Sequence, residues 1–174
     1  MRALTRLAVA AALVSTCALA AGPAALAAQA PPELESVQLG RARTSEPTGA
    51  TVTASMDQAE YADISFNVAF QGFQGNDTFD FRPGRCPASL VRVSAPARVF
   101  KCGWEQRDGR VILRLALEGT FDDGTITVRL APGSMTSPAE PGRYAVTLSG
   151  WSFPDVVGSV RVLDCGPRGD VTGC

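Results

Sequence analysis

The chain has 174 residues, of which 16 are basic and 17 are acidic, and its formal net charge is −1. It carries no basic stripe, so nucleic acid is not expected as a partner. It contains no histidine, which excludes Ser-His-Asp and Cys-His nucleophile systems, histidine zinc sites and histidine general bases. No glycine-rich phosphate loop follows a strand, so nucleotide chemistry has no support. Because these catalytic constellations are lacking, we expect a non-enzymatic protein without a cofactor.

Residues 1–27 have the features of a secretory signal peptide. Arg2 and Arg6 precede an apolar run, and Ala25 to Ala27 form a small-residue cleavage site, so the mature chain should begin at Ala28. The apolar run is too short and interrupted for a transmembrane segment. Secretion is therefore expected, with lipid anchoring at Cys17 as the alternative. The Ala-rich leader and the predominance of Arg among the basic residues are typical of a bacterium with a high-GC genome.

The remaining chain is expected to form one domain. Residues 28–46 are predicted to be a flexible leader with an edge strand at 36–43, and 47–164 to be a β-sandwich. Residues 165–174 should be a C-terminal loop closed by a disulfide. Short alternating segments predict strands, and the clearest alternation lies at 61–70, where every second residue is apolar. The further strand candidates are 51–56, 77–82, 89–95, 125–131, 143–150 and 156–165, with a long connection at 131–142.

A hairpin at 98–119 fixes its own register. Asp108-Gly109 is a preferred dipeptide for a two-residue turn, because both central residues need positive φ. Counting outward pairs Trp104 with Leu113, Cys102 with Leu115 and Phe100 with Leu117, all on one face. The other face then carries Lys101, Glu105, Arg114 and Glu118, with opposite charges on diagonal neighbours.

The mature chain keeps four cysteines, which an exported protein is expected to pair. Three pairings are possible. We favour the two local ones, Cys86 with Cys102 and Cys165 with Cys174. Because Trp104 shares a face with Cys102, the tryptophan should lie beside the disulfide in the core.

Taken together, these patterns predict an all-β fold, an antiparallel immunoglobulin-like β-sandwich of about seven to nine strands with two disulfides. The tryptophan beside a disulfide resembles the immunoglobulin arrangement, although the Cys-to-Trp spacing departs from it. Residues 126–150 resemble the closing strands of bacterial immunoglobulin-like surface domains. The resemblance implies an architecture and transfers no site.

Two oxygen-rich groups are candidates for calcium binding. One is Asp122 with Asp123, and the other is Asn76 with Asp77 and Asp80. Neither matches a defined calcium loop, and such residues between strands are more often simply turn formers.

Two other motifs are candidate ligand contacts. Arg168-Gly169-Asp170 lies inside the expected C-terminal disulfide loop, but it is also good turn material. Trp151 and Phe153 have parity opposite to the inward-facing residues of 143–150. Exposed, they would suit stacking on a sugar or anchoring a protein, and buried, they would plug one end of the sandwich.

Three functions follow in order of preference. The first is a secreted, non-enzymatic module, monomeric, that binds an extracellular protein or glycan or a cell-envelope component. The second is a secreted inhibitor of an exogenous hydrolase, presenting a disulfide-braced loop such as 86–102. The third is a carboxylate-dependent hydrolase, which would need two facing acids.

Overall fold

The computed structural model describes residues 33–55, 64–94, 98–118, 124–150 and 154–164. Within these ranges the secondary structure consists of strands, and no helix is present that could cross a membrane. The strands are β1 (Glu33–Leu39), β2 (Pro47–Ser55), β3 (Ile64–Gln71), β4 (Gln74–Gly75), β5 (Phe79–Pro83), β6 (Val91–Val93), β7 (Arg98–Arg107), β8 (Arg110–Glu118), β9 (Thr125–Thr136), β10 (Gly142–Gly150) and β11 (Val156–Val162).

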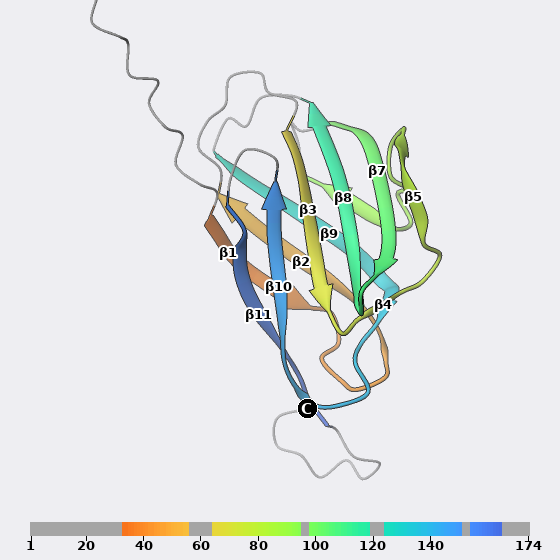
Figure 1. Ribbon diagram of the computed structural model, residues 1–174, viewed down its shortest axis with the longest axis vertical. Coiled ribbons are helices and arrows are strands. Elements are labelled where there is room, and N and C mark those ends of the chain that lie inside the picture. The colour runs from red at the N-terminus through yellow and green to blue at the C-terminus, as the bar shows by residue number, and fades with distance from the viewer. Residues whose placement is uncertain (1–32, 56–63, 95–97, 119–123, 151–153, 165–174) are drawn as a thin grey trace, which may run out of the picture.

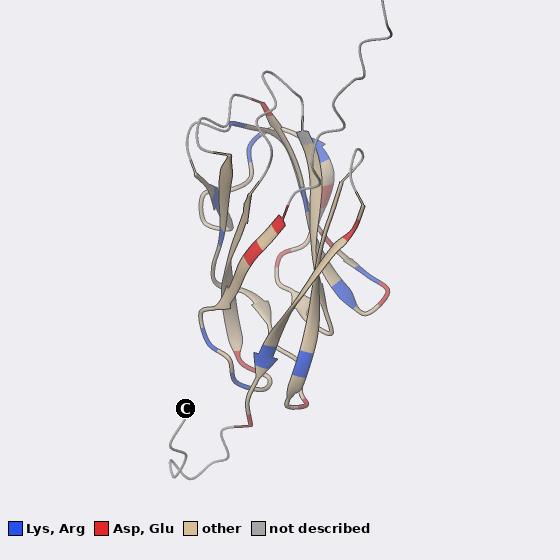
Figure 2. Ribbon diagram, turned by 90° about the vertical axis from the view of Figure 1, so that its left-hand side faces the viewer, with Lys and Arg blue, Asp and Glu red and all other residues tan. Residues whose placement is uncertain are grey.

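These strands form two antiparallel sheets that face one another across one core (Figures 1 and 2). The five-stranded sheet has the order β1-β2-β9-β4, and β6 also pairs with β9. The six-stranded sheet has the order β11-β10-β3-β8-β7-β5. Its strands run obliquely across those of the other sheet in Figure 1. The predicted all-β antiparallel class is therefore confirmed, with eleven strands in the described residues rather than seven to nine.

The β7–β8 hairpin confirms most of the predicted register. Asp108 and Gly109 have φ values of 51° and 70°, and Trp104 pairs with Leu113 and Cys102 with Leu115. The expected pairing of Phe100 with Leu117 is wrong, because a β-bulge shifts the register between Val99 and Lys101. Val99 therefore takes the inward place beside the core, and the Lys101 ammonium lies over the Phe100 ring, 5.8 Å from its centroid.

The core is built from the alternating faces that the sequence predicts. Trp104 is fully buried, as expected, and its indole N–H donates a 3.0 Å hydrogen bond to the backbone oxygen of Asn76. This bond matters because a buried indole N–H without a partner would destabilise the fold. The largest fully buried side chains are Trp104, Phe66, Phe70, Phe73, Leu113, Leu115, Leu117, Ile126, Met135, Leu148, Val68 and Val111.

The alternation of 77–82 predicts that Phe79 and Phe81 both point inward, and for Phe81 this is wrong. Two residues of β5 oppose the single residue Gly103 of β7, so the strand bulges and its alternation changes. A Cβ atom on Gly103 would lie 2.7 Å from the Phe81 Cα, which shows how closely the two backbones approach. Phe81 instead lies on the outer face, with the Arg114 guanidinium 4.6 Å from its ring centroid.

The sequence also predicts a loop at 71–77, and both this segment and 131–142 contribute to the sheets and the core. Within 71–77, Gln74–Gly75 forms β4, and Phe73 is fully buried against Phe70 with ring centroids 5.9 Å apart. The predicted connection 131–142 begins instead as strand, because β9 continues to Thr136 and Met135 is fully buried. Apolar residues in Gly- and Pro-rich segments thus complete the core.

Cys86 and Cys102 form a disulfide, as predicted, with their Cα atoms 5.3 Å apart. The predicted Cys165–Cys174 bridge, the signal peptide 1–27 and Cys17 lie outside the described residues. The strand expected at 36–43 runs from Glu33 to Leu39 and is an edge strand paired with β2.

Candidate functional site: a groove on the outer face of the five-stranded sheet

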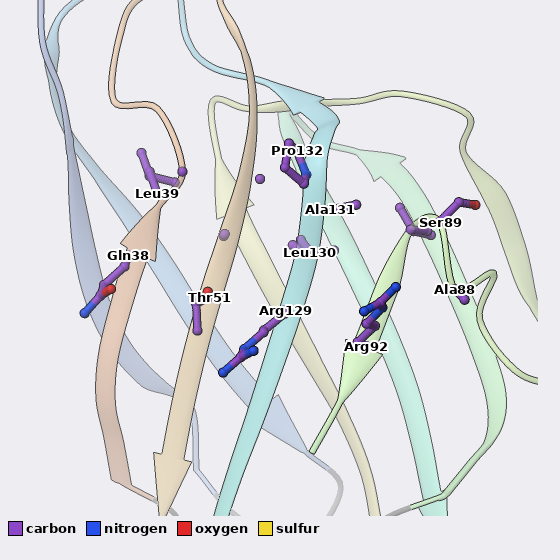
Figure 3. A pocket seen from close by; sticks show the side chains of 14 residues that line it. Gln38, Leu39, Thr51, Ala88, Ser89, Arg92, Arg129, Leu130, Ala131 and Pro132 are labelled. Atoms are coloured by element: carbon purple, nitrogen blue, oxygen red, sulfur yellow. The ribbon is translucent and has the colours of Figure 1, made fainter. Parts of the chain in front are cut away.

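A groove of about 570 Å³ opens on the outer face of the five-stranded sheet. Figure 3 shows the side chains that line it. Its floor is formed by neighbouring stretches of β2 and β9, its first wall by the end of β1, and its second wall by the segment that leads into β6. The lining residues are Gln38, Leu39, Gly40, Gly49, Ala50, Thr51, Ala88, Ser89, Leu90, Arg92, Arg129, Leu130, Ala131 and Pro132.

The groove is hollow because a large bulge in β9 lies opposite a residue without a side chain. The β2–β9 register passes from Thr48 with Met135 to Ala50 with Leu130, so residues 131–134 bulge opposite Gly49. A Cβ atom on Gly49 would lie 2.5 Å from the carbonyl oxygens of Leu130 and Ala131. Glycine is therefore required at this position for the two strands to approach, and the bulge raises Pro132 as an end wall.

Backbone hydrogen bonds hold both walls to the floor. The amide of Gly40 donates to the carbonyl oxygen of Gly49 at 2.9 Å, and the amide of Ala131 donates to the carbonyl oxygen of Leu90 at 2.8 Å. The Leu90 amide donates to the Pro87 carbonyl oxygen at 2.8 Å, one residue beyond the disulfide-bonded Cys86. The groove is thus part of the rigid sheet framework, which limits the entropy lost when a ligand binds.

One cross-strand row supplies the polar groups of the groove. Gln38 pairs with Thr51, Thr51 with Arg129, and Arg129 with Arg92. Both arginines are exposed, and in Figure 3 the Arg129 side chain leans toward Thr51 while Arg92 stays over β6. The ion pairs found in the described residues join Arg43 to Glu46 and Arg114 to Glu105, and neither involves Arg92 or Arg129.

In the predicted calcium group of Asn76, Asp77 and Asp80, Asn76 makes hydrogen bonds within the protein. The Asn76 side-chain amide donates a 2.8 Å hydrogen bond to the Gly133 carbonyl oxygen, and the backbone carbonyl oxygen of Asn76 accepts from the Trp104 indole N–H. Asp77 has a φ of 51°, as a tight turn requires, and Asp77 and Asp80 are both exposed. The described ranges hold no group of three or more acidic or cysteine side chains arranged for a metal ion.

The other predicted site residues lie outside the described part of the chain. They are Asp122, Asp123, Trp151, Phe153, Arg168, Gly169 and Asp170.

Sequence reasoning missed the groove entirely. Arg92 and Arg129 are 37 positions apart and meet only through the β6–β9 pairing, which no local pattern specifies. The one signal was Pro132-Gly133, which interrupts an alternating strand and could have been interpreted as a bulge rather than as its end.

No protein-family model and no curated protein matches the sequence. Among solved structures, the chain is similar to the crystal structure of BslA, described as a bacterial hydrophobin. The identity is 12%, the match covers 76% of this chain and 98% of that chain, and the TM-score is 0.46. These values are too low for the likeness to bear on function.

Proposed function

We propose that the protein is a secreted, non-enzymatic binding module with an immunoglobulin-like sandwich, which engages an extracellular or cell-envelope partner through this groove. The groove carries the proposal. Concave, mostly apolar sites with a few convergent polar groups are the usual places where proteins bind ligands, and about 570 Å³ falls within their ordinary size range. The Cys86–Cys102 disulfide is compatible with an oxidising compartment.

Co-sedimentation with insoluble envelope material from the producing organism tests this function. The chain from residue 28 onward should sediment with the material in a saturable manner. Ala88→Trp places a large side chain on the exposed second wall and should reduce binding at least about tenfold. Ala139→Trp, at an exposed position between β9 and β10, is the matched control and should bind normally. Equal binding by the two variants would show that the groove is not the contact surface.

One observation favours a second candidate, the inhibitor. Pro87, Ala88 and Ser89 are exposed, and the Cys86–Cys102 bridge holds the base of the turn that carries them. A rigid exposed turn of this kind suits insertion into an active-site cleft. Stoichiometric inhibition of a secreted hydrolase, relieved by substitution of Ser89, would support this function over envelope binding.

A further inference from the structure

The polar row of the groove continues into a face of hydroxyl groups. Because strands alternate, the residues between the buried Val52 and Ala54 of β2, and between the buried Ile126 and Val128 of β9, point outward. The next row pairs Ser36 with Thr53 and Thr53 with Thr127, and the last pairs Ser55 with Thr125. We call this surface the hydroxyl face, and its residues are Ser36, Thr51, Thr53, Ser55, Thr125 and Thr127.

Arg92 and Arg129 lie at one end of the hydroxyl face as direct cross-strand partners. Like charges on directly paired residues destabilise a sheet, and an anion bound at the groove would offset this cost. The end of the face farthest from the arginines carries Glu33, which pairs with Ser55. Among the described residues of this surface, the positive charges therefore lie at the groove, and the hydroxyl rows extend from there to Glu33.

A pair of opposed arginines is not by itself diagnostic in this protein. Arg143 pairs with Arg161 on β10 and β11, and Arg107 pairs with Arg110 at the hairpin turn. What distinguishes Arg92 and Arg129 is the combination with a concave groove and adjoining rows of hydroxyls. The other pairs provide controls of the same geometry.

We infer that this surface binds an acidic glycan. Arg92 and Arg129 pair with its carboxylate or phosphate groups, and the hydroxyl face bonds to its sugar hydroxyls. This inference rests on the proposed function and specifies the partner of the same site. Arginine suits the acidic group because its guanidinium forms bidentate, charge-assisted hydrogen bonds to both kinds of oxyanion.

The chemistry of the surface favours a glycan over other polyanions. An extended acidic peptide is usually bound along an open strand edge, whereas the hydroxyls and arginines of this surface lie in rows that run across the strands, with β2 and β9 in the middle paired on both sides. Two arginines at one end, with Glu33 at the other, are too few to neutralise a nucleic-acid backbone. The one exposed large hydrophobic residue found in the described ranges, Val157, lies in the other sheet, so these ranges offer no apolar anchor for a lipid surface near the groove.

Direct binding measurements on defined polymers test the inference. The probes are polygalacturonate for carboxylates, a phosphorylated dextran for phosphates, unmodified dextran as a neutral glycan and poly-glutamate as an acidic peptide. We expect one of the two acidic polymers to bind, and the better one identifies the oxyanion. Arg92→Gln and Arg129→Gln should each weaken binding about tenfold or more, the cost of losing a charge-assisted hydrogen bond. The Arg143→Gln/Arg161→Gln double variant should bind normally.

The hydroxyl face is tested by Thr53→Val with Thr127→Val, which keeps the side-chain shape and removes two hydroxyls. A several-fold loss is expected. The inference is overturned if dextran or poly-glutamate binds as tightly as the acidic glycans, or if the Arg92 and Arg129 variants bind normally. In those cases, envelope co-sedimentation that Ala88→Trp blocks would still support the proposed function. If the protein binds neither the acidic glycans nor the envelope material, the proposed function is rejected together with the inference.

Discussion

Cys86, in the crossover from β5 to β6, is bonded to Cys102 in the middle of β7, so the disulfide ties the start of the groove's second wall to the core of the six-stranded sheet. Cys102 is buried on the same face as Trp104 and opposite Leu115. The Cys86–Cys102 disulfide therefore contributes both to the stability of the fold and to the position of the groove's second wall.

Removing this disulfide should destabilise the fold and weaken ligand binding together. The bridged residues are 16 apart, for which the chain-entropy estimate gives a loss of about 3 kcal/mol. Urea unfolding of the Cys86→Ala/Cys102→Ala variant measures this loss, and binding assays below the transition measure the effect on the groove. Unchanged affinity in the folded variant would show that the wall keeps its shape without the bridge.

Trp104→Phe should cost about 2 to 3 kcal/mol, because it leaves the Asn76 carbonyl oxygen unpaired and creates a small cavity. Phe70→Leu is the control, since it also reduces a fully buried aromatic residue but removes no hydrogen bond. We expect it to cost about 1 kcal/mol. Equal costs in denaturant titrations would contradict a structural role for the indole N–H.

Two glycines should respond differently to alanine. Gly109 has a φ of 70°, and a Cβ atom added to it would have no neighbour within 4 Å, so Gly109→Ala should cost only the backbone strain of about 1 kcal/mol. Gly49→Ala would force a Cβ against two carbonyl oxygens and separate β2 from β9, at about 2 to 3 kcal/mol. Thermal unfolding of both variants ranks the costs, and the reverse order would contradict the close approach at the groove floor.

The ion pair between Arg114 and Glu105, at 3.2 Å, should contribute little. The Arg114 side chain is 40% exposed and water screens the interaction, so Glu105→Gln should change the unfolding free energy by about 0.5 kcal/mol. Chemical denaturation at low and high salt checks this. A loss several times larger would mean that the pair and the neighbouring Phe81 contact act as a unit.

Local patterns predicted those parts of the fold that depend on adjacent residues. Asp108-Gly109 determined the hairpin register as far as Cys102, and alternation placed Phe66, Val68 and Phe70 in the core. The predictions failed at bulges, where one extra residue reverses which side chains face inward. The wrong orientations predicted for Phe100 and Phe81 both have this cause. A bulge depends on how closely the backbones of two strands approach, and the sequence of a single strand does not show this.

The groove could not be predicted for a related reason. Its floor and walls come from four segments that are brought together by the β1–β2, β2–β9 and β6–β9 pairings. Arg92 and Arg129 each occupy an ordinary outward position in an alternating strand. Only the register between those strands places them side by side, and register between distant strands is set by the whole core.

The most direct test of the account maps binding onto individual residues. Backbone amide chemical shifts should be recorded while an oligogalacturonate or a phosphorylated dextran oligomer is added, whichever of the two acidic glycans binds. We expect saturable shifts concentrated on the outer face of the five-stranded sheet, at Thr51, Thr53, Thr127, Arg129 and Arg92. Shifts confined to β10 and β11, which carry the control pair Arg143 and Arg161, or no saturable shifts with either oligomer, would contradict it.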